Sequence, residues 1–343
     1  MRKKTSILII YTGGTIGMVK DHITGTLCPF DFSEINKQVP EIRKFDFKLH
    51  TISLETLIDS SNINPESWIK IGEIIKKQYS KFDGFVILHG TDTMAYTASA
   101  LSFMFENLEK PVILTGSQLP IGTLRTDGKE NFITAIEIAA AQYNNSPVVP
   151  EVCIYFENKL FRGNRATKHS AKNFNAFISE NYPPLAHAGI EIDYNLSAIH
   201  YPTVHDKFKL HSHLCTNVII LKLFPGISEN AIDSILSTKG LKGVVLETYG
   251  SGNAPTEKWF LSQIKKAIKN EIIILNITQC SAGGIDMKLY ETGRELLSMG
   301  VISGTDMTTE AAITKLMFLL GQKLSYTEIR DQLQFSLRGE MSE

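Results

Sequence analysis

A turn rich in glycine and threonine follows the first apolar run of the chain. Residues 6–11 have the composition of a buried strand, and residues 12–17 read Thr-Gly-Gly-Thr-Ile-Gly. Glycines allow a sharp turn, which would present the Thr15 hydroxyl at a strand end beside backbone N–H groups able to bind an oxyanion. The spacing differs from the dinucleotide pattern Gly-x-Gly-x-x-Gly, and no Gly-Lys-Ser/Thr follows. Taken alone, the turn fits a nucleophile site, a structural turn or a phosphate site.

A second polar cluster, His-Gly-Thr-Asp-Thr at residues 89–93, follows the apolar run at residues 84–88. Either Thr91 or Asp92 could be the N-cap of a helix that begins there. Capping by one residue leaves unexplained why this cluster and the turn with Thr15 both follow strands of one predicted sheet. We therefore treat both threonines as candidates for chemistry.

Two further polar segments could join these threonines. Residues 115–118 read Thr-Gly-Ser-Gln directly after an apolar run, and Lys168 ends the segment Arg-Gly-Asn-Arg-Ala-Thr-Lys at residues 162–168. Most lysines are solvated surface charges, which is the default interpretation of Lys168. Only a position close to the threonines would give this lysine a role in catalysis.

The elements that must position these groups alternate between strands and helices. A helix is predicted to begin with Asn64 as its N-cap and Pro65 in its first turn. This alternation predicts an α/β fold, a mostly parallel sheet with helices on both faces and right-handed crossovers, which binds ligands beyond the carboxyl ends of its strands. Strands are predicted at residues 6–11, 84–88, 111–115 and 152–156, and further helices at residues 93–107 and 126–142.

The periodicity fades at residues 189–214 and then resumes. We therefore predict a larger N-terminal catalytic domain over residues 1–190, a linker over 191–214 and a smaller C-terminal α/β domain over 215–343. The second domain is predicted to contain strands at residues 218–224, 243–247 and 272–277 and helices at residues 228–237, 256–269 and 310–320.

Composition argues against several classes of protein. The chain has 343 residues, 43% apolar and 21% charged, with a net charge of −1, which is a poor match to nucleic-acid binding. No run of eighteen apolar residues appears, so no membrane segment is predicted. The four cysteines, without motif spacing, suggest reduced thiols in the cytoplasm. The group His211, His213 and Cys215 lacks a second ligand pair, so we predict no metal site.

Taken together, the motifs resemble the bacterial-type L-asparaginases, and more closely their cytoplasmic type I branch. The resemblance covers almost the whole chain. Its motifs are residues 12–17, 83–94, 115–118, 162–168, 249–255 and 278–280.

The resemblance implies specific roles. Thr15 matches the family's first catalytic threonine, and Thr91, Asp92 and Lys168 match its Thr–Asp–Lys group. The loop with Asp59 and Ser60 matches the one that holds the amino acid's α-amino and α-carboxylate groups, and Ser117 is taken as a further substrate contact. Family members are usually homotetramers built from intimate dimers, whose sites lie between the N-terminal domain of one subunit and the C-terminal domain of its partner.

The predicted reaction is hydrolysis of the side-chain amide of L-asparagine without a cofactor. An amide is a poor electrophile, so the enzyme needs a nucleophile, a proton route and oxyanion stabilisation. We favour acyl transfer through Thr15, followed by hydrolysis with a water held by Thr91, and Lys168 as the base that Asp92 orients. Attack by Thr91 itself and direct attack by water are open alternatives.

Two positions depart from the family pattern. The loop at residues 20–29 lacks the tyrosine that pairs with the first threonine in many members, and Tyr290 from a partner subunit is one replacement. Some cytoplasmic members bind a regulatory asparagine through an arginine at the position of Glu247. A carboxylate there would repel the effector's α-carboxylate, so this control is predicted to be lost or altered, although Thr167 and Cys280 are present.

Three other functions fit parts of the pattern. The asparaginase-like component of the enzyme that amidates glutamyl-tRNA shares the threonine motifs, but it has an additional domain before them, whereas this chain reaches its glycine turn by residue 13. Glutaminase activity is a second alternative, because one methylene discriminates weakly. A catalytically inactive amino-acid sensor is the third, and a sensor has no need for the full set of threonines, aspartate and lysine.

Overall fold

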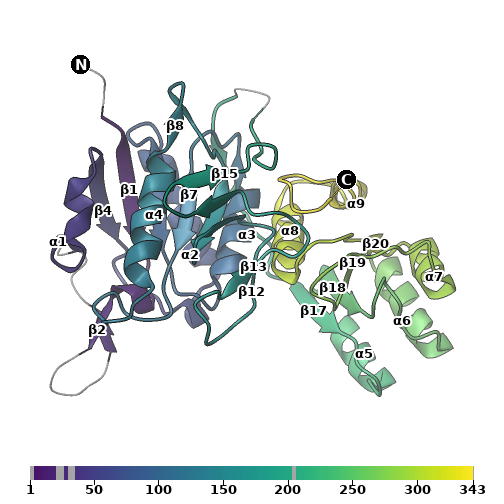
Figure 1. The fold of residues 1–343 in the computed structure, drawn as a ribbon. Coiled ribbons are helices and arrows are strands. Elements are labelled where there is room, and N and C mark those ends of the chain that lie inside the picture. The colour runs from purple at the N-terminus through teal and green to yellow at the C-terminus, as the bar shows by residue number, and fades with distance from the viewer. Residues whose placement is uncertain (1–3, 21–26, 30–34, 203–205, 343) are drawn as a thin grey trace. The chain divides into compact units, whose positions relative to one another are not determined.

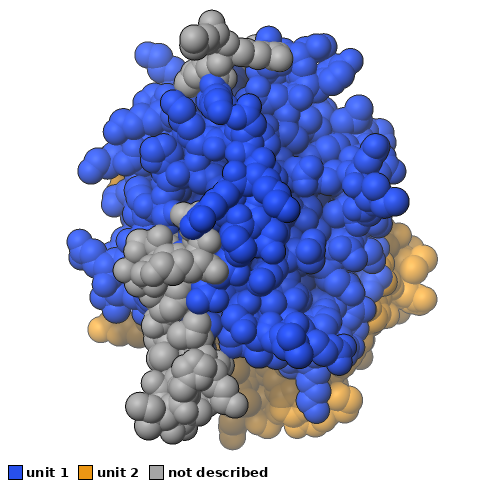
Figure 2. Space-filling view, turned by 60° about the vertical axis from the view of Figure 1, so that its left-hand side comes forward, with its two compact units in different colours: residues 1–212 blue, residues 213–343 orange. Residues whose placement is uncertain are grey.

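The computed structural model describes residues 4–20, 27–29, 35–202 and 206–342. The chain divides into two compact units, residues 1–212 and 213–343 (Figures 1 and 2). Unit 1 contains an eight-stranded, mainly parallel sheet, and unit 2 contains a four-stranded parallel sheet. The predicted α/β fold class, with a larger first and a smaller second sheet, is confirmed.

The sheet of unit 1 has the strand order β15-β14-β11-β10-β7-β5-β1-β4. The five strands from β10 to β4 are parallel, and the other three pair antiparallel. The strands are β1 (Ser6–Tyr11), β4 (Lys48–Ser53), β5 (Gly84–Leu88), β7 (Val112–Thr115), β10 (Val152–Phe156), β11 (Lys159–Arg162), β14 (Ala186–Ala188) and β15 (Ile192–Tyr194).

Helices cover both faces of this sheet (Figure 1). As predicted, the Asn64 side chain caps α2 by accepting from the Ser67 N–H at 3.0 Å, and Pro65 follows in the first turn. The α-helices described in unit 1 are α1 (Ile35–Gln38), α2 (Pro65–Gln78), α3 (Met94–Met104) and α4 (Gly128–Ala140).

The crossover through α4 has the opposite hand to the crossover through α3. Both connections step in the same direction to a parallel neighbour, from β5 to β7 and from β7 to β10. Val86 shares a core with α4, whereas α3 packs on α2, and Tyr79 at the end of α2 stacks on Phe85 on the other face of β5. Two connections that move in the same direction along the sheet, but cross opposite faces of it, have opposite handedness. One of the two crossovers is therefore left-handed, and the expectation that all crossovers are right-handed is wrong.

Short hairpins and turns complete unit 1. The helix predicted at residues 93–107 ends at Met104, because Phe105–Glu106 (β6) pairs with Lys209–Leu210 (β16). The remaining short elements are β2 (Met18–Lys20), β3 (Leu27–Pro29), β8 (Gln142–Tyr143), β9 (Ser146–Pro147), β12 (Thr167–Lys168), β13 (Phe177–Ile178) and the 3-10 turns η1 (Thr15–Gly17), η3 (Pro40–Lys44) and η4 (Ser60–Asn62).

The segment predicted as a linker, residues 191–214, contributes to unit 1 over most of its length. β15 is the edge strand of the large sheet, and β16 pairs with β6 in the same unit. The boundary between the two units falls between Ser212 and His213, near the C-terminal end of the predicted linker.

Unit 2 alternates strands and helices with the strand order β17-β18-β19-β20. Its core packs the helices on buried strands, and Val244 and Ile274 are fully buried there. The elements are β17 (Val218–Lys222), α5 (Glu229–Leu236), β18 (Gly243–Thr248), α6 (Lys258–Lys269), β19 (Ile273–Thr278), α7 (Glu291–Met299), β20 (Ile302–Ser303), α8 (Thr309–Gly321) and α9 (Tyr326–Leu333).

Candidate active site

Two glycine turns pack against each other at the carboxyl end of the large sheet. Because β1 and β5 are parallel neighbours, the turns with Thr15 and Thr91 emerge at the same edge. Gly14 has a φ of 88°, and a Cβ added to it would lie 2.5 Å from the backbone nitrogen of Gly90. Only glycine allows so close an approach, so the first turn rests directly on the second.

The turn η4 packs on the same glycine. A Cβ added to Gly90 would lie 2.5 Å from Ser60 Oγ. Asp59 caps η4 with its carboxylate, and its side chain is exposed, whereas Ser60 is buried. The two residues expected to hold the amino acid therefore lie beside the turn that carries Thr91.

Neither Thr91 nor Asp92 caps the helix that follows them. Thr93 is the N-cap of α3 and makes no capping bond with its side chain. Its Oγ1 donates instead to the Ser60 carbonyl at 2.6 Å, which ties η4 to the start of the helix. The capping explanation for this cluster is wrong, and the Thr91 hydroxyl and the Asp92 carboxylate are available for other contacts.

Lys168 reaches both of these groups. Its Nζ lies 2.9 Å from Thr91 Oγ1 and 2.7 Å from Asp92 Oδ1. The Lys168 side chain is 17% exposed, so it is not the solvated surface charge of the default interpretation. Pairing of β12 with β13 holds it there. Asp92 is 64% exposed, so its carboxylate can meet a ligand cation as well as Lys168.

Gln118, the last residue of the polar segment predicted at residues 115–118, also contacts Thr91. Thr91 Oγ1 lies 3.4 Å from Gln118 Oε1, and Gln118 Nε2 donates to the Asn173 carbonyl at 3.0 Å. The Asp127 carboxylate fixes this loop by accepting from the backbone N–H groups of Gln118 and Leu119, at 2.9 Å and 3.1 Å. Asp127 falls in the first turn of the helix predicted at residues 126–142, where an acidic residue is ordinary, and this hid its role.

Comparison with known proteins identifies the family of the chain. Residues 6–200 match the family described as "Asparaginase, N-terminal", and residues 217–333 match the "Glutaminase/Asparaginase C-terminal domain". The chain belongs to the asparaginase family.

Relatives of this asparaginase-family protein include L-asparaginases and a component of an amidotransferase. The chain is 44% identical to L-asparaginase 1 of Escherichia coli K12 over 99% of both chains. The crystal structure of L-asparaginase I from Vibrio cholerae superposes with a TM-score of 0.90 and 42% identity, covering 99% of this chain and all of that one. A component of the glutamyl-tRNA(Gln) amidotransferase of Pyrococcus abyssi is 33% identical over 98% of this chain and 76% of its own length.

Membership in the asparaginase family makes the protein a hydrolase that acts on amides. Thr15 is the threonine that the sequence predicts as the nucleophile. It begins η1, is half-buried, and its hydroxyl has no hydrogen-bond partner among the described residues. Tyr11 supports the turn from inside, where its hydroxyl donates to the Gly17 carbonyl at 3.1 Å. Burial raises the pKa of Tyr11 to about 12, so this phenol remains protonated and is not a base.

Two predicted substrate contacts of this asparaginase-family protein lie outside the Thr–Asp–Lys cluster. Ser117 is buried, and its hydroxyl donates to the Leu119 carbonyl at 2.5 Å. Tyr290 belongs to unit 2, at the N-cap of α7, and is 51% exposed. Residues 21–26 of the loop that lacks a tyrosine lie outside the described residues.

Glu247, which the sequence analysis matched to a regulatory arginine of some cytoplasmic members, is a buried residue in unit 2. Its carboxylate accepts from Thr309 Oγ1 at 2.6 Å and pairs with Lys222 Nζ at 3.2 Å. The negative charge is thus already neutralised within the unit.

The described ranges contain no group of three or more His, Cys, Asp or Glu side chains that could hold a metal ion. His211, one of the residues considered as a ligand, contacts the Glu106 carboxylate through Nε2. In the same ranges, no helix has both the length and the apolar character needed to cross a membrane.

Proposed function

We propose that the protein hydrolyses the side-chain amide of L-asparagine to L-aspartate and ammonia through an acyl-enzyme formed on Thr15. The observation that carries the proposal is the contact of Lys168 Nζ with Thr91 Oγ1, at 2.9 Å, and with Asp92 Oδ1, at 2.7 Å. This group lies on the turn against which the turn of Thr15 packs. A hydroxyl nucleophile needs a nearby base, and a second hydroxyl beside an amine supplies the proton route.

In the first half-reaction, Thr15 Oγ1 attacks the amide carbon, and its proton passes by way of Thr91 to the neutral Lys168 amine. Backbone N–H groups of the two glycine turns stabilise the oxyanion. The C–N bond then breaks as Lys168 returns the proton to the leaving nitrogen. The products are ammonia and an ester between Thr15 and the aspartyl group.

In the second half-reaction, a water held by Thr91 attacks the ester carbon, and Lys168 accepts its proton. The tetrahedral intermediate collapses, the proton returns to Thr15 Oγ1, and L-aspartate leaves. Asp92 orients Lys168 throughout and binds the substrate ammonium with the exposed part of its carboxylate. No cofactor takes part in either step.

Substrate binding divides between near and distant groups. Asp59 and Ser60 receive the α-amino and α-carboxylate groups, and Ser117 contacts the side-chain end. Tyr290 comes from a partner subunit, so the protein acts as a homo-oligomer, built as a dimer of intimate dimers. It works in the cytoplasm and has no nucleic-acid or membrane partner. Light scattering is expected to give the mass of a single oligomer. Mixing inactive Thr15→Ala subunits with Tyr290→Phe subunits is expected to restore activity.

Hydroxylamine trapping tests the acyl-enzyme. Wild-type protein mixed with L-asparagine and hydroxylamine is expected to form aspartyl hydroxamate faster than it forms aspartate. Thr15→Ala should lose both products by about 10³-fold or more in single turnover, whereas Thr15→Ser, which retains a hydroxyl, should keep a measurable fraction. Full single-turnover chemistry in folded Thr15→Ala would instead support direct attack by water or by Thr91.

A further inference from the structure

His89 is a buried imidazole at the junction between β5 and the active-site turn. Phe85 lies on the face of β5 that meets α2, and by alternation His89 continues this face. Its side chain is 1% exposed. The next residue, Gly90, is the glycine on which the first turn and η4 both pack. His89 therefore sits directly behind the peptide groups that carry Thr91.

Both ring nitrogens of His89 have partners at short distances. Nδ1 lies 2.7 Å from the Gly90 carbonyl oxygen, and Nε2 lies 2.9 Å from Thr97 Oγ1. Trp68 Nε1 in turn donates to Thr97 Oγ1 at 3.0 Å. Three elements therefore join in one line of hydrogen bonds, which runs from α2 through α3 to the end of β5.

The direction of every bond in this line is fixed by its two ends. An indole N–H can only donate and a carbonyl oxygen can only accept. Trp68 therefore donates to Thr97, the Thr97 hydroxyl donates to His89 Nε2, and His89 Nδ1–H donates to the Gly90 carbonyl. A neutral imidazole offers one donor and one acceptor, so this arrangement satisfies the ring completely and selects a single tautomer.

The last bond determines how the Gly90–Thr91 peptide is turned. A trans peptide is planar, and its C=O and N–H point in opposite directions. Holding the Gly90 oxygen toward the buried ring therefore directs the Thr91 N–H away from the core. Within the described ranges, that N–H has no backbone partner. The hydroxyl of the same residue contacts Lys168 in the site.

We propose that His89 is a positioning residue that fixes the Gly90–Thr91 peptide, so that the Thr91 N–H and hydroxyl are presented together to the reacting amide. The proposal rests on the proposed function of this site. His89 does not exchange protons with substrate, because both of its nitrogens are occupied inside the protein. Burial also lowers the pKa of His89 to about 4, so the ring is neutral at physiological pH.

Two substitutions of His89 separate its two nitrogens. In His89→Asn the side-chain N–H occupies the place of Nδ1 and can donate to Gly90, whereas in His89→Gln the amide reaches only the place of Nε2. We expect His89→Asn to retain kcat within about 3-fold and His89→Gln to lose about 10- to 100-fold. KM for L-asparagine should change less than about 2-fold in both, because the loss acts on the reacting groups.

A purely structural role predicts a different pattern. Each variant would then lose activity in proportion to its loss of thermal stability, and the two variants, which remove the same ring, would behave alike. Equal kcat for folded His89→Asn and His89→Gln would overturn the proposal. Melting temperatures measured on the same samples make the comparison independent of foldedness.

Thr97 provides a second test that leaves the histidine in place. Thr97→Val keeps the shape but removes the donor to Nε2, so the ring can adopt the other tautomer and turn a lone pair toward the Gly90 oxygen. We expect a loss of about 10-fold in kcat, with recovery in Thr97→Ser, which restores the hydroxyl. Wild-type kcat in folded Thr97→Val would overturn the proposal.

An assay of ammonia release by the wild-type protein, run in parallel, distinguishes failure of the proposed function from failure of the role of His89. No turnover by folded wild-type protein contradicts the proposed function. Turnover by the wild type without the difference between His89→Asn and His89→Gln contradicts only the role of His89.

Discussion

The two units each contain a lysine paired with a carboxylate at the same distance, in opposite surroundings. In unit 1, Lys168 Nζ lies 2.7 Å from Asp92, with the two side chains 17% and 64% exposed. In unit 2, Lys315 Nζ lies 2.7 Å from Glu340, and both side chains are fully buried. The same two chemical groups are therefore open to a ligand in one place and closed in the other.

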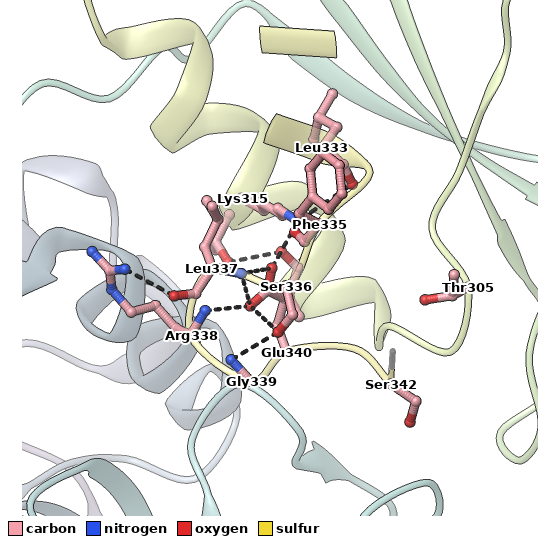
Figure 3. Close-up of polar contacts among 12 residues, drawn as sticks. Thr305, Lys315, Leu333, Phe335, Ser336, Leu337, Arg338, Gly339, Glu340 and Ser342 are labelled. Atoms are coloured by element: carbon pink, nitrogen blue, oxygen red, sulfur yellow. Dashed lines mark hydrogen bonds and ion pairs between the residues drawn. The ribbon is translucent and has the colours of Figure 1, made fainter. Parts of the chain in front are cut away.

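The side chains of the buried pair make their further hydrogen bonds to backbone groups of the protein. Lys315 Nζ donates to the Phe335 carbonyl at 2.6 Å, and the Glu340 carboxylate accepts from the N–H groups of Leu337 and Arg338, at 2.9 Å and 2.7 Å (Figure 3). Burial raises the pKa of Glu340, but the Lys315 charge and these N–H groups outweigh it, and the pKa lies below its usual value. This pair fastens the C-terminal segment to α8.

The comparison teaches that a lysine–carboxylate pair gains a chemical role through what it leaves unsatisfied. Asp92 keeps an exposed carboxylate for a substrate cation, and Lys168 contacts a hydroxyl that can change partners. Glu340 and Lys315 have no such freedom. We expect loss of the first pair to abolish activity with little effect on stability. Loss of the second pair should lower stability with little effect on activity.

The largest expected effect is that of Lys168→Met on turnover. Loss of the only amine in contact with Thr91 among the described residues should lower kcat for L-asparagine about 10³-fold. The free energy of unfolding should change by less than about 1 kcal/mol, because Asp92 is mostly solvated. Steady-state ammonia release and urea unfolding measure the two quantities. Retention of a tenth of wild-type kcat would contradict a catalytic role for this lysine.

The matched change in unit 2 is Lys315→Met. It leaves Glu340 as a buried charge without its ion-pair partner, which should lower the free energy of unfolding by about 3–5 kcal/mol. Turnover by the protein that stays folded should remain within about 2-fold of wild type. The double variant Lys315→Met/Glu340→Gln should lose less than the sum of the single losses. Additive losses, or a single loss below about 1 kcal/mol, would refute the architectural role.

A smaller effect concerns His89, which is buried and neutral. Its pKa is about 4 in the folded protein, below the usual 6.5 that the unfolded chain retains. The unfolded state therefore binds more protons between these values, so stability is complete above pH 6.5 and falls toward pH 4. The free energy of unfolding, measured with urea, should therefore fall by about 2 kcal/mol between pH 6.5 and pH 4.5. His89→Asn should remove that part of the slope; an unchanged slope would assign it elsewhere.

The smallest expected effect is on the shape of the rate curve. Because Glu247 is paired with Lys222 and Thr309 and carries the charge opposite to a regulatory arginine, we expect a hyperbolic dependence of rate on L-asparagine, with a Hill coefficient of about 1. Initial rates over a wide range of concentration measure it. A strongly sigmoidal curve would show that asparagine regulates the protein despite this glutamate.

Much of the fold followed from local sequence. β1, β5 and β10 have the predicted bounds, because continuous apolar runs bounded by turn residues indicate strands buried on both faces. β4 was missed, since Lys-Leu-His-Thr-Ile-Ser is an edge strand whose side chains are partly or largely exposed. The hand of the α4 crossover depends on which face the helix covers, which no short stretch of sequence specifies.

The site divides in the same way. The glycine turns and their threonines could be recognised because the chemistry lies within a few consecutive residues. The segment that contains Gln118 was predicted to join the threonines, but the contact between Gln118 and Thr91 was not, because 27 residues separate them. Asp127 was missed because its position in the first turn of a predicted helix already explained an acidic residue. His89 was missed because its partners Thr97 and Trp68 lie on two helices. Lys315 stood in an apolar helix, a signal of burial, but its partner near the C-terminus could not be inferred.

Ammonia release by the purified protein, measured with L-asparagine and L-glutamine in parallel in a buffer that contains a chelator, tests the central claim most directly. We predict turnover of L-asparagine that persists in the chelator and is well above that of L-glutamine. No ammonia from either amide, by protein shown to be folded, would contradict the assignment of this site to asparagine hydrolysis.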